Sequence, residues 1–307
     1  MSEASAHADA APATAKPATL SWRRVFYWSV RRELWENPAI WLAPLAMEAV
    51  VLVPFVFSTW RLPHALRTIQ AGDTKHAEQL WAAPSAAAMA ALVMGLFVAL
   101  LYSLNTLHNE RRDRSLLFWK SLPVSDRTAV LAKAFVAMAV IPAAIVVIAI
   151  ATQAVMLAWS TAVTLLSGLD PQLLWAHQDM GMMWTVLPYG MFVNALWLAP
   201  IFALFLLISA WAPRSPVIWA LGLLAAPPLI ERVSLNTTHV WQFESERLFG
   251  GFAEAFSVGG LAKVPLRTLA DLDPARTFSR PDLWIGLVFA GLFLTAAVWL
   301  RHRREPV

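Results

Sequence analysis

Six long runs of apolar residues, separated by polar and basic segments, dominate the chain. A helix rises 1.5 Å per residue, so about 20 apolar residues cross a hydrocarbon core of about 30 Å. The pattern therefore predicts an all-α, polytopic membrane protein with six transmembrane helices, at residues 39–60, 85–107, 128–159, 186–211, 217–230 and 284–300. The fifth run is short and contains Pro227 and Pro228, so a re-entrant segment is the alternative there.

The distribution of basic residues favours six crossings. With six spans, both termini are cytoplasmic, and the inner side holds fourteen Lys and Arg residues against nine on the outer side. Cytoplasmic loops of membrane proteins carry this excess of positive charge. Six of the nine outer residues belong to one long external loop, residues 231–282, where the bias has least force. The predicted location is the bacterial inner membrane.

Composition supports the membrane assignment, because only 14% of the 307 residues are charged and 58% are hydrophobic. Soluble domains carry about 25% charged residues. Cysteine is absent, which excludes disulfides and thiolate metal sites. Residues 1–20 are rich in Ala, Pro and Thr and lack the apolar core of a signal peptide. We expect a disordered cytoplasmic tail there, followed by one transmembrane domain over residues 21–304.

Residues 21–37, ahead of the first span, form an amphipathic pattern. On a helical wheel, Trp22, Phe26, Val30 and Leu34 make an apolar arc. This pattern predicts an N-terminal helix that lies in the cytoplasmic membrane interface. The alternative is an ordinary basic segment that stops at the membrane surface.

The chain carries no recognisable catalytic motif. The sequence has no GxxxxGK[ST] phosphate loop, no HExxH and no GxSxG, and no two histidines have metal-ligand spacing on one helix, so no metal site is predicted. Among polar residues inside the spans, Glu48 either lines a pathway or serves as structural glue, since an ionisable group in a membrane needs a partner or a cavity. Gln153 and Asn194 are expected to make interhelical hydrogen bonds.

The second cytoplasmic loop, residues 108–127, combines arginines with a run of large apolar residues. Residues 110–121 are predicted to be helical, and Pro123 favours an end to that helix at Leu122. Ser125 or Asp126 can then cap the third span. A solvated loop does not need four consecutive apolar residues such as Leu116, Leu117, Phe118 and Trp119. They either enter the lipid interface beside the arginines or dock into a groove on a soluble partner.

This loop resembles the cytoplasmic loop of ABC type-2 transporter permeases. The resemblance rests on an acidic residue, basic residues, Leu-Leu, Leu-Pro-Val-Ser and a downstream lysine, here Glu110, Arg111, Arg112, Leu116, Leu117, Leu122, Pro123, Val124, Ser125 and Lys133. The resemblance extends over roughly residues 21–304. It includes the six spans, the internal termini, the preceding interfacial helix and the large loop before the last span. Arg114-Ser115 departs from the Gly-Thr that family members often have.

The resemblance implies the membrane subunit of an ATP-driven exporter. Two such subunits, identical or different, would pair within the lipid bilayer, and each would dock on a separate ABC ATPase subunit, in two copies, that binds ATP and Mg. This chain would bind no cofactor and no nucleic acid, and would not be an enzyme. Residues 110–122 would form the coupling helix, with Glu110, Arg111, Arg112, Arg114, Leu116, Leu117, Phe118, Trp119, Lys120, Leu122 and Pro123 as docking residues. A membrane-embedded enzyme and a secondary transporter are the alternatives.

Overall fold

The computed structural model describes residues 21–72, 75–113, 124–175, 180–255 and 274–303, and these contain helices and no strand. The all-α prediction is confirmed for this part of the chain. Six of the helical segments are long and apolar enough to cross a membrane. They are Ala39–Gln70, Ala83–Arg112, Asp126–Leu166, Gly181–Trp211, Pro216–Leu235 and Pro281–Arg303. Each contains one predicted span, so the protein has the helices of a multi-pass membrane protein.

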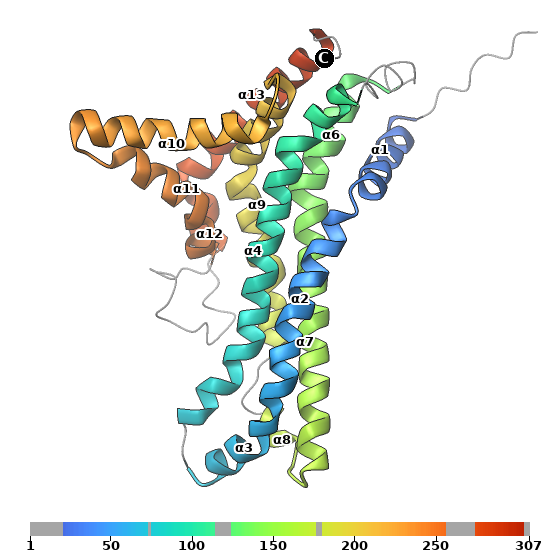
Figure 1. Ribbon diagram of the computed structural model, residues 1–307, viewed down its shortest axis with the longest axis vertical. Helices are drawn as coiled ribbons and strands as arrows, with labels where there is room; N and C mark the ends of the chain where they lie inside the picture. The colour runs from blue at the N-terminus through green and yellow to red at the C-terminus, as the bar shows by residue number, and fades with distance from the viewer. Residues whose placement is uncertain (1–20, 73–74, 114–123, 176–179, 256–273, 304–307) are drawn as a thin grey trace, which may run out of the picture.

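The long helices α2 (Ala39–Ser58), α4 (Lys75–Arg112), α7 (Ile141–Leu166) and α9 (Met180–Trp211) run along one bundle (Figure 1). The apolar window of α9 is the most buried of the six, so α9 forms the centre of the core. Helices α4 and α7 approach closely at Gly95, where a Cβ atom would lie 2.4 Å from Cγ1 of Ile145. Small residues permit such close packing between membrane helices.

The third span is one continuous helical rod. Helix α6 (Asp126–Phe135) passes through a π-helical turn, Val136–Val140, into α7. Pro142, the second residue of α7, lacks the N–H that a regular helix would use, and a single π turn accommodates this mismatch. At its far end, Gly168 has a φ of 71°, and the N–H of Leu169 bonds to the carbonyl of Thr164. This closure, which favours glycine, ends the helix.

The first span continues beyond the predicted end at residue 60. A 3₁₀ turn, Thr59–Arg61, and α3 (Leu62–Gln70) extend α2, and the short α8 (Gln172–Trp175) packs nearby (Figure 1). Leu62 and Leu66 are buried with Leu174 at this end. Apolar packing outside the hydrophobic run therefore prolongs the helix, which the sequence pattern did not predict.

The predicted N-terminal helix is present as α1 (Trp22–Glu36). Val30 and Leu34 pack against the main core, and Phe26 meets Phe135 of α6 edge to face. Most of the apolar arc thus faces the protein, while Trp22 is exposed. An interfacial position stays a prediction, and residues 1–20 lie outside the described residues.

Helix α10 (Pro216–Leu235) contains the fifth predicted span but leaves the end of the bundle and runs across its long axis (Figure 1). It is the shortest and least apolar of the six candidate spans, with 20 residues and a mean hydropathy of 1.4. Residues 231–235, at the start of the predicted external loop, are the last residues of α10. The region also contains α11 (His239–Ala255) and α12 (Pro274–Ser279). The Glu231 carboxylate accepts hydrogen bonds from the backbone of His239 and Val240, and so caps α11.

Helix α13 (Pro281–Arg303) packs along α9 and completes the bundle. Its C-terminal end lies at the same end of the bundle as α1, because Arg301 and Arg32 both contact Glu110. The cytoplasmic location of both termini stays a prediction.

Candidate functional site

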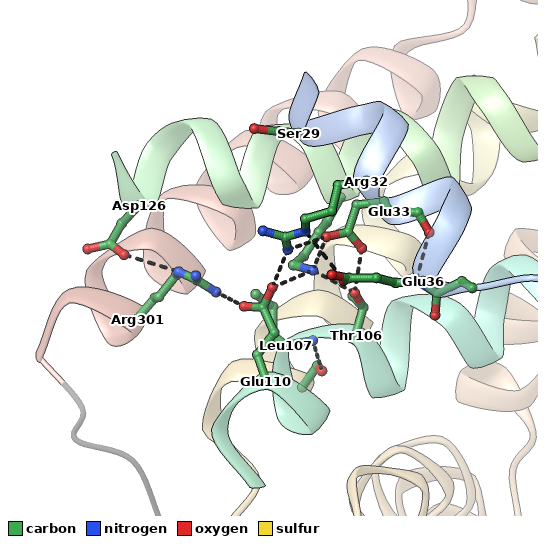
Figure 2. A network of polar contacts seen from close by, with 12 residues as sticks. Ser29, Arg32, Glu33, Glu36, Thr106, Leu107, Glu110, Asp126 and Arg301 are labelled. Carbon is green, nitrogen blue, oxygen red and sulfur yellow. Dashed lines mark hydrogen bonds and ion pairs between the residues drawn. The ribbon is translucent and has the colours of Figure 1, made fainter. Parts of the chain in front are cut away.

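A network of buried ion pairs joins four helices at the end of the bundle that bears the 108–127 loop (Figure 2). Its centre is Lys133 of α6, whose ammonium lies 2.6 Å from Glu33 and 3.0 Å from Glu110. Arg32 of α1 donates to the same oxygen of Glu110 at 2.8 Å. Arg301 of α13 pairs with the other oxygen of Glu110. The network thus connects α1, α4, α6 and α13.

Hydroxyl groups complete the inner part of the network. Tyr102 donates to Oε2 of Glu33 at 2.8 Å, and Thr106 donates to the same oxygen at 3.2 Å. Thr106 also accepts a hydrogen bond from Lys133 at 2.9 Å. Because Tyr102, Thr106 and Glu110 are four residues apart, they lie on one face of α4. Helical periodicity therefore explains how α4 supplies three of the partners.

These charges are removed from solvent. Lys133 is 1% exposed, Glu33 2% and Glu110 7%. A buried charge is stable only when it is paired and its remaining polar atoms are bonded, and loss of one partner costs about 3–5 kcal/mol. The network satisfies this requirement by setting Arg32, Lys133 and Arg301 against carboxylates. It therefore holds the four helices in one arrangement.

The electrostatics of Glu33 and Glu36 differ although both lie on α1. Burial has the largest single effect on Glu33 and raises its pKa, but the charge and hydrogen bond of Lys133 and the charge of Arg32 together outweigh burial, so the pKa lies below its usual range. For Glu36, burial raises the pKa, and the attraction of Arg32 at 3.3 Å does not offset it. Glu33 is therefore the carboxylate of α1 whose ionised form stabilises the fold.

Both ends of the 108–127 loop are anchored by one arginine. Arg301 pairs with Glu110, at the end of α4, and its Nε lies 3.0 Å from Asp126, the first residue of α6. The hydroxyl of Ser125 accepts from the backbone N–H of Thr128 at 3.2 Å, so the predicted cap of the third span is confirmed at Ser125. The loop thus leaves and re-enters the bundle at two fixed points.

A second set of contacts ties α4 to the C-terminal end of α9. Arg111 donates to the carbonyl groups of Ser209 and Ala212, each at 2.8 Å. The last carbonyl groups of a helix lack partners within the helix, so a guanidinium placed there is favourable. The Ser209 hydroxyl in turn accepts from the backbone N–H groups of Leu107 and His108. The ends of the two helices are therefore locked together.

The predicted docking residues that the structure describes differ in exposure to solvent. Glu110 and Arg111 are 7% and 4% exposed, and both make contacts inside the protein, whereas Arg112 is exposed and pairs with Asp113 at 3.2 Å. Glu110–Arg112 continue α4 as its last turn. The other predicted docking residues, Arg114, Leu116, Leu117, Phe118, Trp119, Lys120, Leu122 and Pro123, lie outside the described residues. Docking on a partner stays a prediction for the whole set.

The three polar residues predicted inside spans have different surroundings. Gln153 is fully buried, donates to the carbonyl of Pro84 on α4 and accepts from Trp184 on α9. Asn194 is buried against Gly251 of α11, and its side-chain oxygen has no hydrogen-bond partner among the described residues, so the predicted interhelical bond is not formed by that atom. Glu48 is 2% exposed. The Thr152 hydroxyl lies near its carboxylate, but neither carboxylate oxygen makes a hydrogen bond of normal geometry within the described residues. Gln153 is thus an interhelical link, while Glu48 is an isolated buried carboxylate.

Sequence reasoning did not identify Glu33, Lys133, Asp126 and Arg301 as site residues. One signal was available, because Lys133 lies inside a predicted span and a lysine at that depth is normally paired. Its partners lie 23 to 100 residues away in sequence, so no local pattern could name them. Among the described residues, no group of three or more His, Cys, Asp or Glu side chains could hold a metal ion.

Comparison with known proteins gives no match. No family model fits the chain, and neither the curated proteins nor the solved structures include a similar one. The resemblance of the loop to ABC type-2 permeases therefore rests on the sequence motif alone.

Proposed function

We propose that this chain is the membrane-spanning permease subunit of an ATP-driven ABC exporter, and that it docks on a separate ATPase through the 108–127 loop. In this proposal, the end of the bundle with the ion-pair network faces the cytoplasm of a bacterial cell, and a second permease subunit completes the transporter. The absence of a phosphate loop supports the division of labour, since ATP hydrolysis would belong to the partner.

The observation that carries the proposal is the anchoring of both loop ends in one buried network. Glu110 precedes the loop, Asp126 follows it, and Arg301 contacts both. Lys133 and Arg32 extend the same connection to α6 and α1. A displacement of the loop by a partner would therefore act on four helices together. Coupling between distant sites requires such a contiguous, rigid connection or an element with two states.

The outward surface of α1 agrees with this orientation. Trp28 and Trp35 are exposed, and the Arg31 guanidinium lies 5.0 Å and 4.6 Å from their ring centres. Tryptophan and arginine together suit the boundary between lipid and water. A helix of this kind beside the start of α2 supports a position at the cytoplasmic surface.

Purification of the chain from its native membrane in mild detergent tests the proposal. We expect an ATPase that contains a phosphate loop to accompany the wild-type chain and the Arg303→Gln variant. Arg303 is exposed at the same end of the bundle but outside the loop, so it serves as the matched control. Trp119→Ala and Arg112→Glu should reduce the recovered ATPase. Absence of any such ATPase, or equal recovery with all variants, would contradict the proposal.

Arg111 is unsuitable for this test. It caps the end of α9 from a buried position, so reversal of its charge would perturb the fold and the docking surface together. Arg112 is the better choice because it is exposed and its only described ion pair is a surface contact with Asp113, which contributes little to stability.

Glu48 favours one alternative, a secondary transporter driven by protons. An isolated carboxylate buried in a span is typical of proton-coupled pathways. The discriminating experiment is transport by the purified chain in vesicles with a proton gradient and no ATPase. Transport that is lost in Glu48→Gln would favour this alternative. Dependence on the ATPase, with transport retained in Glu48→Gln, would favour the permease.

A further inference from the structure

A basic pocket lies between the end of α4 and the junction of α9 with α10, on a different face of α4 from the ion-pair network. Its volume is about 460 Å³. It is lined by Asn105, His108, Asn109, Arg111, Arg112, Pro213, Arg214, Ser215 and Pro216. Among the residues that the structure describes, three arginines and one histidine line the pocket, and no acidic residue does. We propose that it binds a phosphate group.

Helix geometry explains how α4 builds its side of the pocket. Asn105, His108, Asn109 and Arg112 follow the spacing i, i+3, i+4, i+7, which places them in one row along a helix. The row presents amide, imidazole and guanidinium groups, all of which can donate hydrogen bonds. A planar guanidinium matches two oxygens of a phosphate at once, which a point charge cannot do.

The opposite wall is the turn Pro213–Ser215 that leads into α10, together with Pro216. Pro216 begins α10, a helix of 20 residues, and the Ser215 side chain makes no capping hydrogen bond to it. The first N–H groups of a helix have no partner within the helix and attract anions. Arg214 stands beside them, is exposed, and makes no salt bridge with any residue that the structure describes. The positive charge of Arg214 is therefore not balanced within the described chain.

The position of the pocket indicates which class of molecule carries the phosphate group. Trp211 ends α9, Trp219 lies in the first turn of α10, and their rings meet edge to face at 4.7 Å. Tryptophan favours the level of the lipid headgroups. A phosphate at this level belongs most readily to an anionic lipid, and the volume leaves room for groups attached to it. Inorganic phosphate would satisfy the same donors.

The experiment measures thermal unfolding of the purified chain in mild detergent, without any partner, so that it is independent of the exporter proposal. A ligand that binds only the folded protein raises Tm. The three probes are phosphatidylglycerol in the micelle, a glycolipid without phosphate at the same mole fraction, and inorganic phosphate in solution. Arg214→Gln and Arg112→Gln test the pocket. Arg127→Gln is the matched control, since Arg127 is exposed at the same end of the bundle and does not line the pocket.

We expect phosphatidylglycerol, and not the glycolipid, to raise Tm of the wild type and of Arg127→Gln. In each pocket variant, the lipid concentration needed for half of the effect should rise about tenfold, because a charged hydrogen bond is lost. An effect of inorganic phosphate alone, also weakened by Arg214→Gln, would support the pocket with a soluble ligand. The proposal is overturned if neither phosphate probe raises Tm, or if Arg127→Gln weakens the response as much as the pocket variants do.

Discussion

The last turns of α4 have two faces that differ in how their charged side chains are paired. One face carries Tyr102, Thr106 and Glu110 into the ion-pair network, where cations meet carboxylates and water is excluded. The other face carries Asn105, His108, Asn109 and Arg112 into a basic pocket without acidic lining residues. A satisfied network stabilises one arrangement of helices, whereas a pocket lined by an excess of arginines favours an external anion. The same helix end thus serves structure on one face and binding on the other.

The largest expected effect is on stability, at Lys133. In Lys133→Met, Glu33 and Glu110 lose the cation between them, so the free energy of unfolding should fall by about 3–5 kcal/mol. Thermal or SDS-induced unfolding in detergent measures the change. The double variant Lys133→Met/Glu33→Gln should lose less than the sum of the two single variants, since it removes one unpaired charge. Strict additivity would show that the pair does not interact as described.

Arg301→Gln should have a smaller effect. Glu110 keeps Lys133 and Arg32 as partners in this variant, so only the connection of α13 to Glu110 and Asp126 is lost. We expect a decrease of about 2 kcal/mol in the free energy of unfolding, as for a lost hydrogen bond to a charged group. His302→Gln, which alters only an exposed contact with Asp126, is the control. A larger loss in His302→Gln than in Arg301→Gln would contradict the assignment.

Acid should weaken the network through Glu33. Its pKa is lower in the folded protein than in the unfolded chain, where glutamate titrates near pH 4.3. The stabilisation by its charge is therefore complete above about pH 4.3 and is lost as the pH falls toward the folded-state pKa. Unfolding measured from neutral pH to well below about pH 4 should show a smaller decrease in stability for Glu33→Gln than for the wild type.

Glu36→Gln is the matched control for this pH effect, because the pKa of Glu36 is raised by burial rather than lowered. Removal of Glu36 should leave the acid-induced loss of stability in place. If Glu36→Gln abolishes that loss and Glu33→Gln does not, Glu33 is not the responsible carboxylate.

The smallest effect is expected in the pocket. Arg214→Gln should change the free energy of unfolding by less than about 0.5 kcal/mol in the absence of phosphate-bearing lipids, since it makes no described salt bridge. The same unfolding measurement compares it directly with Lys133→Met. A large destabilisation by Arg214→Gln would remove the distinction between the two faces of α4.

Much of the fold is predictable from the sequence because each membrane helix corresponds to a long run of apolar residues. The six runs, the helix before the first span and the cap at Ser125 all follow from hydropathy and local backbone chemistry. The extension of the first helix to Gln70 was not predictable in this way. It depends on the burial of Leu62 and Leu66 against Leu174, more than 100 residues further along the chain.

The sequence by itself determined the all-α fold and its six helices, each long and apolar enough to cross a membrane. Only the tertiary structure decided which partners Lys133 has, because Glu33, Glu110 and Lys133 come from three helices that no short pattern relates. It also decided that α10 runs across the bundle, since length and hydropathy fix what a helix can bury and not its direction. Local chemistry determines the helices, and contacts between distant residues determine the site.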